Sequence, residues 1–261
     1  DAFFDARLVS ATGADAGATP GMLNSVSAIN AAPQMRQVAH GPHQPVSGQD
    51  VTVTVKATDP QGVAQVTLDY QTVDPGDYIS VTDPRYSNAS YWTTVTMYDD
   101  GTNGDAVAGD DVYSAVVPAA VQTNRRLVRY RVTAEDTLGA SVTGPYADDT
   151  QGNFAYYVYD GVPDWTGSAQ PGVEPDVVYD SQTLTSVPVY TLITERVDHL
   201  NALHVPYRNG EIEQQLPTSG TYGGSDYLWE GTLIYDGVVY DNIRYRARGG
   251  VWRYAMGKNM W

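Results

Sequence analysis

The sequence of 261 residues contains no cysteine, which excludes disulfide bonds, thiolate zinc sites and cysteine nucleophiles. It also lacks any run approaching the ~18 apolar residues of a membrane-spanning helix, so we expect no membrane insertion. Positive charge is scarce, because 15 Lys and Arg stand against 31 Asp and Glu and the formal net charge is −16. Nucleic-acid binding depends on Lys and Arg that neutralise phosphates, so this balance argues against nucleic acid as a partner.

Phenylalanine is also rare, with 3 residues against 20 Tyr, and the abundant Tyr, Thr and Gly indicate β-rich surfaces exposed to water. The chain opens on DAFFDARLVS, without an initiator Met or an apolar secretion signal. We therefore expect a processed or internal piece of a longer protein. The acidity and the scarcity of Lys are typical of secreted bacterial proteins, so we expect an extracellular or cell-surface location.

Short segments of alternating apolar and polar residues recur between residues 33 and 160. In VTVTVKA, Val51, Val53 and Val55 fall on one face and Thr and Lys on the other, which is the pattern of a half-buried strand. Further strands are predicted at 64–72, 91–97, 112–117, 127–134 and 154–159. About seven short strands separated by turn signals are typical of an immunoglobulin-like β-sandwich. We predict a mainly β fold with this sandwich at 33–160.

Two segments without apolar periodicity flank the predicted sandwich. Residues 1–32 are rich in Ala, Gly and Ser, which indicates an extended lead-in at the end of a preceding domain. Residues 161–185 begin with a stretch rich in Pro and Gly, so we expect a linker there.

A second unit is expected at 186–261. It opens with the strand-like VPVYTLI, continues with a helical pattern at 194–204, and then has two strand-like runs joined by Asp236 and Gly237. An Asp-Gly pair is suited to a two-residue hairpin turn. One helix with so few strands does not make a complete core, so we predict a partial α+β unit.

Positive charge collects at the end of this unit. The segments GTLIYDGVVYDNIRYRARGG and WRYAMGKNMW resemble the start of the spore-coat-protein-H (CotH) kinase domain, in which a hairpin ending in Arg-x-Arg-Gly leads to an Arg and then to a Lys before an aromatic residue. The matching positions are Arg246, Arg248, Gly249, Arg253, Lys258 and Trp261. The layout also resembles large secreted bacterial proteins in which lamin-tail-like and immunoglobulin-like domains precede the kinase unit. The pattern differs from the common one at Trp252 and Asn259.

The resemblance implies a parent protein that transfers phosphate from ATP to a protein hydroxyl. It implies a phosphate contact for Lys258, with Arg248 and Arg253 shaping the loop around the nucleotide. The family's catalytic and metal-binding carboxylates belong to later segments, so no catalytic residue is assigned and this chain alone is expected to be inactive. ATP and Mg²⁺ would bind only in a full-length parent. The alternative is a strand pair with an Arg-rich, solvated face, which needs no enzyme.

Acidic residues are dense in the loop DDGTNGDAVAGDD (99–111), between two predicted strands. Calcium is bound by several oxygen ligands on a chain that bends sharply, and Gly residues allow such bends. The candidate ligands are Asp99, Asn103, Asp105, Asp110 and Asp111. The alternative is an ordinary hairpin loop in which Asp, Asn and Gly satisfy turn geometry.

Two further functions are compatible with the residues. An incomplete sheet leaves an edge for a protein partner or for self-assembly as an adhesive or structural subunit. An aromatic cluster could form a sugar-binding platform, with scattered aromatic packing as the alternative. Its members are Tyr86, Tyr91, Trp92 and Tyr98. His40 and His43 lie in a Pro-containing loop, where a surface turn is a simpler explanation than a metal site.

Overall fold

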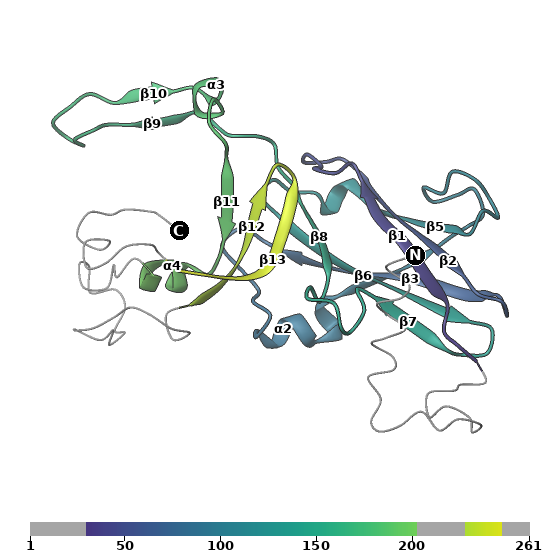
Figure 1. The fold of residues 1–261 in the computed structure, drawn as a ribbon. Helices are drawn as coiled ribbons and strands as arrows, with labels where there is room; N and C mark the ends of the chain where they lie inside the picture. Colours follow the sequence, from purple (N-terminus) through teal and green to yellow (C-terminus); the bar gives the residue numbers. More distant parts are fainter. Residues whose placement is uncertain (1–29, 203–227, 247–261) are drawn as a thin grey trace.

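The computed structural model describes residues 30–202 and 228–246, and the fold is mainly β, as predicted (Figure 1). The strands are β1 (Gln34–Gly41), β2 (Val51–Thr58), β3 (Val63–Val73), β4 (Thr93–Met97), β5 (Val112–Val117), β6 (Leu127–Asp136), β7 (Ser141–Gly144), β8 (Phe154–Tyr157), β9 (Trp165–Gly167), β10 (Val177–Tyr179), β11 (Tyr190–Ile193), β12 (Trp229–Tyr235) and β13 (Val238–Tyr245). The helices are short: α2 (Pro84–Ser87), α3 (Ser181–Leu184) and α4 (Arg196–Ala202), with 3-10 turns at Ala89–Tyr91 and Ala119–Val121.

Two antiparallel sheets form the sandwich. The first sheet has the order β1-β2-β5, and the second has the order β4-β3-β6-β7, with β8 also paired to β6. The region predicted to be a sandwich, 33–160, therefore consists of two antiparallel sheets that share one core. Strands β7 and β8 pair with successive parts of the same edge of β6, and residues 145–153 connect them.

The first core lies between these two sheets. Strand β2 alternates buried and half-buried residues, and Val51, Val53 and Val55 are fully buried, as the period-two pattern predicted. Leu68 and Val132 of the second sheet belong to the same cluster. Burial of each such side chain stabilises the fold by roughly 1.5–3 kcal/mol, so this cluster is the main source of the sandwich's stability.

A second core lies on the opposite face of the second sheet. In β6, the four successive residues from Leu127 to Tyr130 are all buried, so both faces of this strand are covered. Tyr130 belongs to the first core, whereas Leu127 belongs to the second together with Ile234 of β12. The third sheet, in the order β11-β12-β13, therefore packs on the sandwich (Figure 1).

The hairpin of the third sheet has the predicted turn. Tyr235 pairs with Val238, and the intervening Asp236 and Gly237 have φ angles of 50° and 75°. Two positive φ angles define a type I′ turn, which matches the twist of the flanking strands. The helical pattern predicted at 194–204 corresponds to α4.

Residues 161–185, expected to be a linker, contain structure of their own. Strands β9 and β10 pair into a ribbon, followed by α3, and the ribbon projects from the rest of the chain in Figure 1. Among the described helices none is long and apolar enough to cross a membrane. The predicted lead-in, 1–32, lies almost wholly outside the described residues.

Candidate functional site

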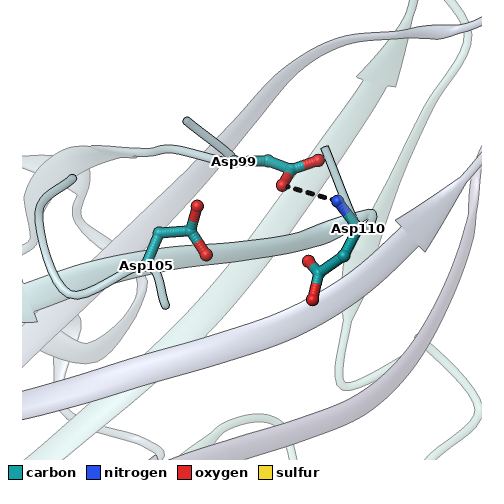
Figure 2. A group of neighbouring side chains, drawn as sticks. All are labelled: Asp99, Asp105 and Asp110. Atoms are coloured by element: carbon teal, nitrogen blue, oxygen red, sulfur yellow. Dashed lines mark hydrogen bonds between the residues drawn. The ribbon is translucent and has the colours of Figure 1, made fainter. Parts of the chain in front are cut away.

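The acidic loop connects β4 to β5 and brings three carboxylates together. Oxygens of Asp99, Asp105 and Asp110 all lie within 4.8 Å of one another. Figure 2 shows the three side chains around a common space, with the Asp99 carboxylate hydrogen-bonded to the backbone nitrogen of Asp110. Such a group of oxygen ligands suits a hard cation such as calcium.

Backbone N–H groups hold two of these carboxylates in place. Asp99 Oδ1 accepts hydrogen bonds from the backbone nitrogens of Gly109 (2.8 Å) and Asp110 (3.1 Å). Asp105 Oδ2 accepts from the backbone nitrogen of Gly101 at 2.6 Å. Since a carboxylate has about four lone-pair sites, each retains acceptor capacity for a cation.

Gly104 allows the loop to fold tightly against the first sheet. Its φ angle is 91°, and a Cβ at this position would lie 2.8 Å from Thr52 Cγ2 and 3.0 Å from Val116 Cγ2. A larger residue would therefore push the loop away from β2 and β5. This close approach buries most of the adjacent Asp105.

The surroundings of the three carboxylates are short of positive charge. Lys56 Nζ donates to the backbone oxygen of Asp110 at 3.1 Å, and within the described residues no ion pair joins the three carboxylates to Lys or Arg. Burial raises the pKa of the neighbouring Tyr113, and the charges of Asp99 and Asp111 raise it further. The loop therefore carries negative charge that a bound cation would neutralise.

Two other predicted ligands lie in the same loop beside this group. Asp111 is not part of the carboxylate group, and its backbone nitrogen donates to Asp99 Oδ2 at 3.0 Å. Asn103 donates from Nδ2 to Thr102 Oγ1. Both residues adopt positive φ angles, 53° for Asn103 and 67° for Asp111. The predicted cofactor contacts Arg248, Arg253 and Lys258 lie outside the described residues.

The aromatic cluster does not form an open platform. The Tyr86 hydroxyl donates to Asn153 Oδ1 at 2.7 Å, and the Tyr86 ring is buried in the second core. The guanidinium of Arg131 lies 4.1 Å from the centre of the Trp92 ring and 5.0 Å from that of Tyr86. The guanidinium therefore covers ring faces of Trp92 and Tyr86 that a sugar would need for stacking. Tyr91 remains exposed.

The sequence did not predict a buried ion pair between the sandwich and the third sheet. Arg129 of β6 donates from Nε to Asp241 Oδ2 of β13 at 2.7 Å and from Nη2 to Oδ1 at 3.1 Å. Both side chains are buried, with 0% and 2% of their surfaces exposed. A signal was present in LVRY, where apolar residues flank the Arg on both strand faces, but its partner is 112 residues away.

The remaining polar groups of this pair are satisfied. Arg129 Nη1 donates to the backbone oxygen of Ile79 (2.7 Å), and Asp241 accepts from Thr232 Oγ1 and from Asn153 Nδ2 (2.9 Å). Burial opposes ionisation of Asp241, but the charge and hydrogen bonds of Arg129 outweigh it and hold the pKa of Asp241 below its usual value. The two units are thus joined by a bidentate, desolvated ion pair.

Comparison with known proteins gives no further guide to function: no family model matches the chain, and neither does any curated protein.

Proposed function

We propose that the chain belongs to a secreted, CotH-type protein kinase, in which the sandwich is a scaffold for the opening sheet of the kinase unit. The observation that carries the proposal is the buried Arg129–Asp241 pair, which joins the sandwich to β13. The residues that resemble the kinase family lie on the β12–β13 hairpin and in the segment after it. The proposal also places the protein outside the cell or on its surface.

The position of Asp241 supports this role. In phosphoryl transfer the protein contributes mainly the positioning and neutralisation of the phosphates. Arg244 and Arg246 follow Asp241 closely in the chain, and both are exposed. Because Asp241 is anchored in the sandwich, the start of the cationic segment has a defined position, whereas the magnesium ligands and the catalytic base would come from other parts of the parent protein.

Phosphate transfer from radiolabelled ATP tests this function. The protein containing this chain is incubated with Mg²⁺ and ATP labelled at the γ-phosphate, and labelled Ser, Thr or Tyr is measured. Lys258→Met should reduce the label to background. The control variant Arg36→Ala removes a cation of β1 that donates to Thr58 Oγ1. Arg36 is far from Lys258 in the sequence, so this variant should leave the label unchanged. Absence of labelling in the unmodified protein, or full labelling in Lys258→Met, would refute the kinase assignment.

A second candidate function is self-association through the ribbon β9–β10. Two-stranded ribbons are marginally stable alone, and this one pairs with no third strand among the described residues. Trp165, Val177 and Val178 are 54%, 48% and 63% exposed, so the ribbon offers apolar surface to a second copy of the chain.

Sedimentation equilibrium distinguishes this assembly from a monomer. Val178→Lys should shift the protein towards monomer, because a charge would be buried in the contact. Leu138→Lys changes a comparably exposed residue in the β6–β7 turn and should have no effect. A protein that stays monomeric at high concentration would exclude self-association.

We also propose that calcium is the ligand of the acidic loop, held by Asp99, Asp105 and Asp110. Calcium would have a structural role there, because the loop joins one sheet of the sandwich to the other and carries no catalytic group of the proposed kinase.

A further inference from the structure

The junction between the two units contains an open cleft of about 590 Å³. Most of its wall comes from three segments, with Tyr130 of β6 between them. The segments are residues 38–43 of the sandwich, residues 145–155, which run from the end of β7 into β8, and residues 237–241 of the β12–β13 hairpin. Binding sites of small molecules are commonly clefts of ~300–1,000 Å³ between structural units. We propose that this cleft binds a neutral sugar. The proposal does not depend on the kinase assignment, although Asp241 lines the cleft as well.

The charges of the wall exclude an anionic ligand. None of the cleft's lining residues is Lys or Arg, and two are carboxylates, Asp149 and Asp241. Asp241 is already compensated by Arg129, and Asp149 Oδ2 accepts from the backbone nitrogen of Tyr146 at 2.7 Å. With a net charge of −16 on the whole chain, phosphate or carboxylate groups would be repelled from this wall.

The imidazole of His40 contributes a neutral surface. His40 Nε2 lies 3.2 Å from the backbone oxygen of His43, which can only accept, so Nε2 carries the proton. Nδ1, 3.0 Å from the Tyr130 hydroxyl, then accepts from that hydroxyl. This neutral tautomer agrees with the effect of burial, which lowers the pKa of His40. Both nitrogens are used internally, so His40 gives shape to the cleft without adding charge.

Ring faces and apolar side chains line the same cleft. The rings of His40 and His43 are nearly parallel, with centroids 5.9 Å apart, and His43 is exposed. Phe154 and Val238 line other parts of the wall. Such surfaces suit the C–H faces of a pyranose ring, which are apolar although its edges carry hydroxyls.

Gln151 supplies the polar group that selects a hydroxyl. Its Oε1 is shielded from solvent and accepts no hydrogen bond from the described residues. A buried acceptor without a donor is unfavourable by about 1–3 kcal/mol, and turning the amide towards a ligand hydroxyl in the cleft would remove that cost. Gln151 lies between β7 and β8 and lines the cleft, so an amide acceptor stands beside the apolar surfaces.

The test compares glucose with glucose 6-phosphate in NMR titrations of the isotopically labelled protein. Glucose should perturb amides of all three wall segments with a Kd of about 1 mM, the range expected for a ligand with so few atoms. Glucose 6-phosphate should bind at least about tenfold more weakly because of its charge. Gln151→Leu should weaken glucose binding about tenfold, whereas Gln170→Leu, the same change on the exposed β9–β10 ribbon, should not alter it.

Three results would overturn the proposal. The first is that neither glucose nor N-acetylglucosamine perturbs any wall amide at a sugar concentration of about ten times the expected Kd. The second is that glucose 6-phosphate binds as tightly as glucose. The third is that the amide perturbations caused by glucose are confined to the exposed Tyr91 and Tyr98. The amide perturbations of the unmodified protein locate the contact even if Gln151→Leu does not fold.

Discussion

Replacement of Asp241 by Asn should destabilise the whole junction. The substitution keeps the size of the side chain but leaves the Arg129 guanidinium buried without a counter-charge, and Arg cannot lose its proton. Removal of one partner of a buried pair costs about 3–5 kcal/mol. The rings of Tyr86 and Tyr78, 5.2 and 5.7 Å from the guanidinium carbon, compensate part of the charge, so the lower end of this range is expected.

Urea unfolding followed by tryptophan fluorescence measures this loss. Trp92 packs against the second core, and Trp229 is the first residue of β12 in the third sheet, so both units carry a reporter. A loss of about 3 kcal/mol should lower the urea midpoint by roughly 1–2 M. The double variant Arg129→Met, Asp241→Leu should lose less than either single variant. No buried charge remains in it, and what is lost is the set of hydrogen bonds that Arg129 and Asp241 make to neighbouring groups such as Ile79 and Thr232.

The free energy of unfolding should depend on pH with opposite signs in the unmodified protein and in Arg129→Met. In the unmodified protein the pKa of Asp241 is lowered, so its contribution is complete above the unfolded value of about 3.9 and is lost as pH falls through the folded pKa. In Arg129→Met burial, the largest influence on Asp241, is no longer offset by a counter-charge and is opposed only by the hydrogen bonds of Thr232 and Asn153. We expect the pKa of Asp241 to rise, so this variant should gain stability as pH falls from 7 to 5. A loss below about 1 kcal/mol in Asp241→Asn, or a double variant equal to the sum of the singles, would refute the reasoning.

Three further outcomes are expected from the loop and the hairpin turn. Calcium at about 100 times its Kd should stabilise the protein by about 2.7 kcal/mol and raise Tm by roughly 5–10 °C, measured by calorimetry, and Asp105→Asn should abolish the shift. The same titration should lower the pKa of Tyr113, followed by NMR, because the part of its rise due to negative charge is neutralised; an unchanged pKa would place the ion elsewhere. Gly237→Ala should lower the free energy of unfolding by about 1–3 kcal/mol, measured in urea, because φ is 75° and the new Cβ would lie 2.7 Å from His43 Cδ2. The control Gly172→Ala, with φ of 82° and no atom within 4 Å of the new Cβ, should lower it less.

Local sequence was sufficient where the structure depends on near neighbours. The alternation in VTVTVKA predicted which face of β2 is buried. Asp236 with Gly237 predicted the two-residue hairpin turn, because positive φ angles suit these residues. The density of acids in the loop likewise predicted a group of carboxylates. Which of them converge was not predictable, since Asp111 uses its backbone nitrogen rather than its side chain in this contact.

Tertiary contacts decided the rest. Period-two patterning places Arg129 on the outer face of the sandwich, where a solvated Arg is ordinary, but the third sheet covers that face and makes the Arg a buried anchor. The cleft beside it exists only because segments distant in the sequence meet. Strand positions and turns follow from the preferences of adjacent residues, whereas the burial of a charge and the shape of a cavity depend on surfaces supplied by residues more than a hundred positions away, as Asp241 is from Arg129.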